Sequence, residues 1–134
     1  MANVSEIEGI GKAYAEKLQA NGIKTTAALL EAGASKKGRD SISGATGIDY
    51  DKILKWVNMA DLFRIKGVGE EYSELLEAAG VDTVKEVRTR NAENLHAKMV
   101  EVNEAKKLVR ALPSVSQVES WVEHAKTLDP VVTH

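Results

Sequence analysis

Two stretches of the chain repeat each other and decide its fold: residues 7–25 read IEGIGKAYAEKLQANGIKT, and residues 65–83 read IKGVGEEYSELLEAAGVDT. Nine of the 19 aligned positions are identical. A second echo aligns the apolar helical face around Trp56 with the face around Trp121, which lies 65 residues later instead of 58. Two echoes in the same order indicate a tandem repeat whose second copy carries seven extra residues.

The repeated stretches carry the signals of short helices. Apolar residues recur at helical spacing after the paired glycines, as Tyr14 and Leu18 do in the first copy. Gly22 and Gly80 then stop these predicted helices as left-handed C-terminal caps. Residues that signal the start of further helices follow at Thr25, Ser35, Asp49, Thr83, Asn91 and Ser116. Because no strand-length alternation of apolar and polar residues occurs, we predict an all-α fold.

The two tryptophan helices predict how the copies are arranged. Helix 51–64 is apolar on two sides, whereas helix 117–128 has a single apolar face. The extra apolar side of helix 51–64 consists of Leu54, Met59, Leu62 and Phe63. We therefore expect two units, residues 1–60 and 61–134, that share helix 51–64 and pack as one compact helical body.

Composition bounds the class of protein. Of the 134 residues, 43% are apolar and 28% are charged, which is the balance of a globular chain. No apolar run approaches the length of a membrane span, and residues 1–6 show no secretory signal, so we expect a cytoplasmic protein without a membrane partner. The absence of cysteine excludes disulfides, thiolate metal sites and cysteine nucleophiles. No cofactor is expected.

Charge is distributed unevenly along the chain. The formal net charge is −2, which argues against a protein that coats nucleic acid over its whole surface. Residues 1–67 nevertheless carry a net charge of +2, and residues 68–134 carry −4. A phosphate backbone would therefore be bound by the first half of the chain.

The paired glycines carry a family resemblance. The pattern apolar-x-Gly-apolar-Gly at residues 7–11 and 65–69, each followed by a leucine and then by Gly-apolar, resembles the helix-hairpin-helix motif. The whole chain also resembles an uncharacterised family of small bacterial proteins with two such units in tandem. The resemblance implies a fold of two helix-hairpin-helix units and non-specific, salt-sensitive binding of duplex DNA through phosphates.

The first glycine pair is the better candidate for an anion site, because backbone N–H groups at a helix N-terminus attract anions. Cations lie beside it in the sequence. The predicted DNA-binding residues are Gly9, Ile10, Gly11, Lys12, Lys17, Lys36, Lys37 and Arg39. The second set is weaker because Glu70 and Glu71 follow it: Lys66, Gly67, Val68 and Gly69.

Two other interpretations compete with DNA binding. The glycine pairs also suit purely structural turns, in a protein-interaction adaptor whose turns and acidic helix 70–79 contact a partner. Catalysis has little support, since Tyr14 and Tyr72 replace the third glycine of a dinucleotide fingerprint. His96, His124 and His134 are too far apart to indicate a metal site. We therefore predict a binding protein that is not an enzyme.

Overall fold

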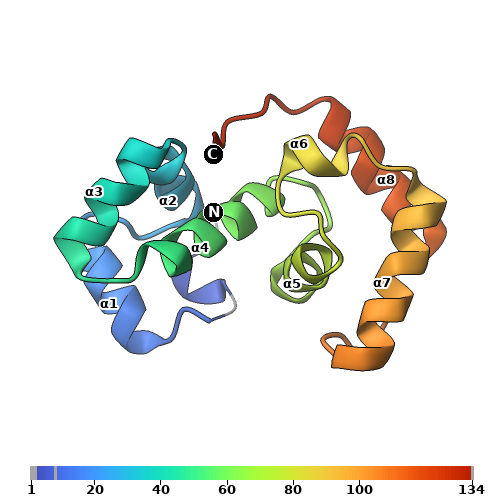
Figure 1. Cartoon of the computed structure of the whole chain (residues 1–134), viewed down its shortest axis with the longest axis horizontal. Coiled ribbons are helices and arrows are strands. Elements are labelled where there is room, and N and C mark those ends of the chain that lie inside the picture. The colour runs from blue at the N-terminus through green and yellow to red at the C-terminus, as the bar shows by residue number, and fades with distance from the viewer. Residues whose placement is uncertain (1–2, 8, 134) are drawn as a thin grey trace. The chain divides into compact units, whose positions relative to one another are not determined.

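A computed structural model of the chain describes residues 3–7 and 9–133. In these residues it contains one short 3-10 helix and eight α-helices (Figure 1). They are η1 (Val4–Glu6), α1 (Lys12–Ala20), α2 (Thr26–Gly33), α3 (Lys36–Thr46), α4 (Tyr50–Leu62), α5 (Glu70–Ala78), α6 (Val84–Val87), α7 (Ala92–Lys106) and α8 (Val115–Lys126). Extended pairing among the described residues is limited to one isolated antiparallel bridge, between Asn3 and Thr25. The prediction of an all-α fold is confirmed.

Four of the predicted helix starts are confirmed by side-chain caps. The side chains of Thr25, Ser35, Thr83 and Asn91 each accept a hydrogen bond from the backbone N–H three residues later, at 3.0–3.4 Å. Such caps satisfy N–H groups that have no partner inside the helix. Capping therefore explains why α2, α3, α6 and α7 begin where they do.

The start of α8 differs from its prediction. Ser116 was the expected signal, but the helix begins at Val115 and its cap is Ser114. The Ser114 hydroxyl accepts from the Gln117 N–H at 3.1 Å, and the Gln117 side chain accepts from the Ser114 N–H at 2.9 Å. This reciprocal pair satisfies two backbone donors, which a cap at Ser116 with Glu119 would leave unpaired.

The chain divides into two compact units, here called unit 1 and unit 2. Unit 1 contains the residues up to Asp61 together with the segment that begins at Val131, and unit 2 is Leu62–Pro130. The repeat predicts that residues 131–134 belong to the second unit. The described part of this segment instead bonds to unit 1, because the Thr133 N–H donates to the Ala34 carbonyl at 2.8 Å. Val132 beside it is buried.

A tryptophan lies at the centre of each core. Trp56 packs with Tyr14 in unit 1, and Trp121 packs with Tyr72 in unit 2, with ring centroids 5.2 Å apart in both pairs. Both indole rings are almost completely buried, as their apolar helical faces predict. The surrounding core of unit 2 includes side chains from α5, α6, α7 and α8, together with Leu62 at the end of α4 and apolar residues of the connecting segments.

Helices α4 and α8 differ in how far burial extends around them. Every residue of α4 from position 56 to 62 is buried. In α8 the buried residues form one face: Val118, Trp121, Val122 and Ala125. The buried stretch of α4 is mostly apolar but includes the polar residues Asn58 and Asp61. Of the predicted second apolar side, Met59 and Leu62 are fully buried, and Leu54 and Phe63 are partly buried.

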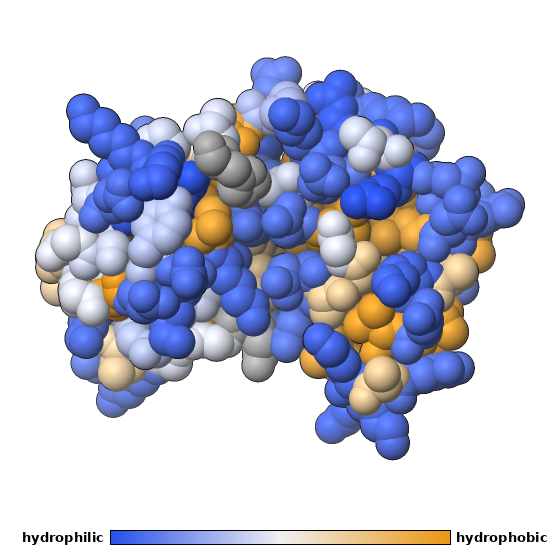
Figure 2. Space-filling model, viewed as in Figure 1, coloured by the Kyte–Doolittle hydropathy of each residue, from blue (hydrophilic) through white to orange (hydrophobic). Residues whose placement is uncertain are grey.

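The exterior is mainly hydrophilic in the view of Figure 2, although apolar side chains reach the surface between α5 and α7 of unit 2. Among the described residues, no helix combines the length and the apolar character that crossing a bilayer requires.

Candidate phosphate-binding turn

The first glycine pair forms a tight turn, here called turn one (residues 9–11), directly before α1. Gly9 has φ of +92°, a region that glycine enters readily and other residues rarely adopt. Ile10 points into the core with 4% of its surface exposed, and its N–H donates to the Ile7 carbonyl at 3.1 Å. Gly11 then caps α1 in extended conformation without any side-chain hydrogen bond. Turn one thus presents backbone, rather than side chains, at the helix start; Glu8, inside the motif, lies outside the described residues.

The glycines at the start of both turns also make room for the tryptophans. A Cβ on Gly9 would lie 3.5 Å from Nε1 of Trp56, and a Cβ on Gly67 would lie 3.0 Å from Nε1 of Trp121. Gly67 has the same φ as Gly9, +92°. In each unit, therefore, the first glycine of the turn packs against the tryptophan. This contact explains why the glycine pattern and the tryptophan helix are repeated together.

Two lysines of the predicted site lie on α1 itself. Lys12 is the first residue of the helix and is exposed. Lys17 lies in its last turn, also exposed, with Nζ 6.0 Å from the centre of the Tyr14 ring. The first turn of α1 contains no acidic residue. The positive charge of Lys12 accordingly adds to the positive end of the helix dipole at turn one. No carboxylate in the first turn of α1 cancels that charge.

Lys36 and Lys37 are exposed, but they lie away from turn one. Both belong to the start of α3, which Figure 1 shows at the opposite end of unit 1 from the turn before α1. Lys36 forms an ion pair with Asp40 at 3.3 Å and lies 5.5 Å from the ring centre of Tyr50. The structure therefore does not bring these two lysines to the predicted anion site.

Arg39 is a correction to the predicted site. Its side chain is completely buried, and its guanidinium donates to four oxygens of unit 1. The acceptors are the Tyr50 hydroxyl at 3.1 Å and the carbonyls of Gly33 at 2.9 Å, Ala34 at 3.0 Å and Thr133 at 2.6 Å. Arg39 is thus a structural residue that ties the segment beginning at Val131 to the rest of unit 1, and its buried guanidinium is not exposed to a ligand from outside.

The second glycine pair, turn two (residues 67–69), has the same backbone but different electrostatics. Val68 is buried as Ile10 is, and Gly69 caps α5 without a side-chain hydrogen bond. Glu70 and Glu71 occupy the first turn of α5, where carboxylates satisfy the helix dipole. The Lys66 N–H donates to Nδ1 of His124 at 2.9 Å, so its backbone is held by α8. An anion at turn two would meet two carboxylates.

The histidines do not form a metal site in the described part of the chain. No group of three or more histidine, cysteine, aspartate or glutamate side chains in residues 3–7 and 9–133 could hold a metal ion. His124 Nδ1 accepts a hydrogen bond from the Lys66 N–H, and His96 Nε2 lies 2.9 Å from the Pro113 carbonyl oxygen. His134 lies outside the described residues.

Comparison with known proteins identifies the family. Residues 8–128 match the family described as a domain of unknown function (DUF4332), and this match covers most of the chain. The chain therefore belongs to that family. No solved structure matches the chain.

Proposed function

We propose that this protein binds duplex DNA weakly, without reading sequence, through the backbone of turn one and the lysines of α1. The observation that carries the proposal is the start of α1: a helix N-terminus capped only by Gly11, with Lys12 as its first residue and no acidic residue in its first turn. Unpaired N–H groups at a helix start bind phosphates in many proteins. The resemblance of residues 7–11 to the helix-hairpin-helix motif supports the same ligand.

The proposed interface is smaller than the sequence predicts. It consists of the backbone of Gly9, Ile10 and Gly11 with the side chains of Lys12 and Lys17. Lys36 and Lys37 lie at the other end of unit 1 and contribute at most to long-range attraction. With few cations available, binding is expected to be weak and sensitive to salt.

The proposed role is binding without catalysis, at a cytoplasmic location. In this proposal turn two has a structural role only, since the carboxylates of Glu70 and Glu71 would repel a phosphate there. An adaptor that contacts a protein through the turns and α5 remains the competing function, and the DNA titration separates the two.

The test is a titration of fluorescently labelled duplex DNA, followed by anisotropy at a series of salt concentrations. The logarithm of the binding constant should fall linearly with the logarithm of salt, with a slope of about −0.9 for each phosphate contacted. Duplexes of unrelated sequence should bind equally well. No binding at low salt, with the folded protein at high concentration, would contradict the proposal and favour the adaptor.

A further inference from the structure

Residues 131–133, here called the docked segment, lie against the rest of unit 1 without forming a helix or a strand. Val132 is the anchor, with 8% of its surface exposed, whereas Val131 and Thr133 on either side of it are exposed. Thr133 makes the polar contacts. Its N–H donates to the Ala34 carbonyl at 2.8 Å, its hydroxyl donates to the same carbonyl at 3.4 Å, and its own carbonyl accepts from Arg39 at 2.6 Å. Unit 1 thus recognises one apolar side chain and the residue that follows it.

The Arg39 guanidinium is fixed in place by other parts of unit 1. Its Nε donates to the Tyr50 hydroxyl at 3.1 Å, and its Nη1 donates to the carbonyls of Gly33 at 2.9 Å and Ala34 at 3.0 Å. Its Nη2 donates to the docked segment, through the Thr133 carbonyl. Because the first three bonds hold the guanidinium, little ordering of this side chain is needed when Nη2 binds an acceptor.

The charge of Arg39 meets no carboxylate in the described part of the chain, where all four of its acceptors are uncharged oxygens. The carbonyls at the end of α2 offset part of this charge, since a helix C-terminus carries about half a negative elementary charge. The first turn of α3 offsets none of it, because that turn contains Lys36 and Lys37 and no acidic residue. The acceptor position at Nη2 therefore favours an anion over a neutral carbonyl.

The docked segment is held by a small contact, which consists of one buried side chain and the bonds of Thr133. Segments with so few buried apolar contacts open at low free energy compared with a helical core. When this segment leaves, Nη2 of Arg39 loses its acceptor while the bonds of Nε and Nη1 keep the guanidinium in position. The open state then presents a fixed cation beside the apolar place that Val132 has vacated.

We propose that the site of the docked segment binds the carboxyl-terminal end of a partner protein. The terminal carboxylate of the partner takes the place of the Thr133 carbonyl, and the apolar residue before it takes the place of Val132. The chain itself continues past Thr133, so its own acceptor there is a neutral carbonyl. A carboxylate forms a stronger, charge-assisted bond with a guanidinium, and capture of a terminal carboxylate is a recurring mode of peptide recognition.

The docked segment acts in this proposal as an intramolecular competitor. A partner reaches Arg39 only after the segment leaves, and the covalent link keeps the segment at a high effective concentration. Binding to the native chain is therefore expected to be weak, and substitutions that release the segment should strengthen it. The inference does not depend on DNA binding, since turn one takes no part in the site.

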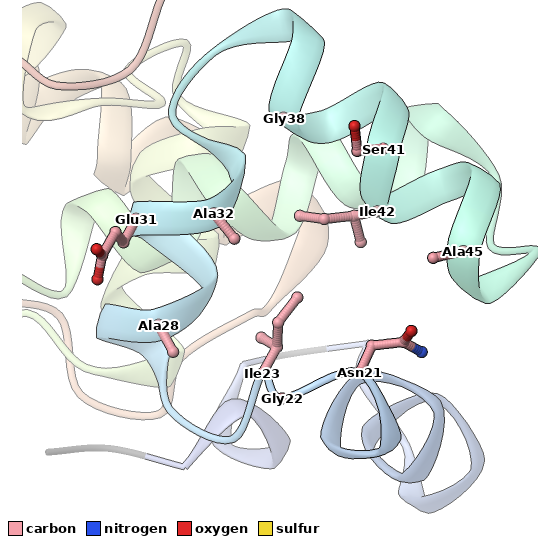
Figure 3. Close-up of a pocket in the computed structure, with 10 residues that line it drawn as sticks. All are labelled: Asn21, Gly22, Ile23, Ala28, Glu31, Ala32, Gly38, Ser41, Ile42 and Ala45. Carbon is pink, nitrogen blue, oxygen red and sulfur yellow. The ribbon is translucent and has the colours of Figure 1, made fainter.

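A separate groove in unit 1 provides an internal reference. It has a volume of about 590 Å³ and lies among the turn after α1, helix α2 and helix α3 (Figure 3). Neither Ala34 nor Arg39 is among the residues that line it. Ala28 and Ala45 do line it, so their backbone amides report binding in this groove rather than at the site of the docked segment.

The test is an NMR titration of the isotope-labelled full chain with the acetylated peptide Leu-Asp-Pro-Val-Val-Thr, which copies residues 128–133. The peptide is used in two forms that differ only at the end, where one has a free carboxylate and the other an amide. Saturable shifts are expected at the Ala34 amide and at the Arg39 Nε–H, and not at turn one, Ala28 or Ala45. The carboxylate form should bind at least about fivefold more tightly, since charge-assisted hydrogen bonds are roughly twice as strong as neutral ones.

Substitutions in the docked segment test the competition. Val132→Asn removes the anchor of the segment and should raise the affinity for both peptides several-fold. Val131→Asn is the matched control, because it changes the exposed neighbour in the same way, and it should leave both affinities unchanged. Arg39→Gln should remove the preference for the carboxylate form. Since that variant loses buried hydrogen bonds and could fail to fold, the comparison of Val132→Asn with Val131→Asn is the test that does not depend on it.

The inference is contradicted if the carboxylate peptide causes no saturable shifts at Ala34 and Arg39 in folded Val132→Asn at millimolar concentration. Equal affinities of the carboxylate and amide forms would overturn a terminal carboxylate as the ligand. Equal affinities of Val132→Asn and Val131→Asn would overturn competition by the docked segment, and shifts confined to Ala28 and Ala45 would place the peptide in the groove instead. Circular dichroism of each variant establishes that it is folded.

Discussion

Turn one and turn two have matching backbone conformations, but the side chains that follow them carry opposite charges. Gly9 and Gly67 share φ of +92°, and each lies against the tryptophan of its own unit. After turn one the helix begins with Lys12, whereas after turn two it begins with Glu70 and Glu71. The packing of the turn and its capacity to attract an anion are therefore separate properties. The first follows from glycine and tryptophan, and the second follows from the first helical turn.

The largest expected effect tests the shared packing. Trp56→Ala and Trp121→Ala should each destabilise the protein by about 3–5 kcal/mol, because each removes a buried aromatic side chain and leaves a cavity. Urea unfolding followed by circular dichroism measures both. A loss below about 1 kcal/mol for either variant would show that the two tryptophans are not equivalent core residues.

The next prediction concerns a cation that unit 1 buries and for which the described residues of unit 2 have no equivalent. Arg39→Lys should lower the free energy of unfolding by about 1–3 kcal/mol, since an ammonium cannot reach all four acceptors and leaves buried oxygens unpaired. DNA affinity of the folded variant should be unchanged at low salt. If the variant keeps native stability and binds DNA more weakly, the structural role of Arg39 is contradicted and a direct role in DNA binding is supported.

A smaller effect distinguishes the two glycines. Gly9→Ala and Gly67→Ala should each cost about 1–2 kcal/mol, because alanine is strained at positive φ. Gly67→Ala should cost more than Gly9→Ala, since its Cβ would lie 3.0 Å from the Trp121 indole nitrogen and not 3.5 Å as at Trp56. Thermal melting of the pair provides the ranking, and the reverse order would contradict this account of the turns.

The smallest expected effect on stability comes from the charges beside the turns. Lys12→Glu should stabilise the native state slightly and the double substitution E70K/E71K should destabilise it, each by about 0.3–1 kcal/mol through the helix dipole. Urea midpoints of the two variants and the wild type measure this. A loss of several kcal/mol in either would mean that these side chains take part in packing.

The sequence predicts the parts of the fold that depend on local chemistry. The starts at Thr25, Ser35, Thr83 and Asn91 and the left-handed glycines Gly22 and Gly80 follow from single residues and their neighbours. The sequence alone favours a start of α8 two residues too late, because Ser114 and Ser116 both precede possible capping partners and only geometry selects between them.

The candidate site was predicted less well, for a physical reason. The cluster at Lys36, Lys37 and Arg39 reads as one basic patch, but the Arg39 side chain is buried and donates to carbonyls contributed by other segments. Those carbonyls come into reach only through the tertiary fold, which the local sequence does not specify.

The most direct test of the central claim exchanges the charges of the two turns and measures duplex DNA affinity at low salt. Lys12→Glu, which gives turn one the charge of turn two, should abolish binding, and E70K/E71K should strengthen it and make the salt dependence steeper by about −0.9 for each new phosphate contact. Circular dichroism should show both variants folded. Equal affinity and equal salt dependence for wild type, Lys12→Glu and E70K/E71K would contradict binding through turn one.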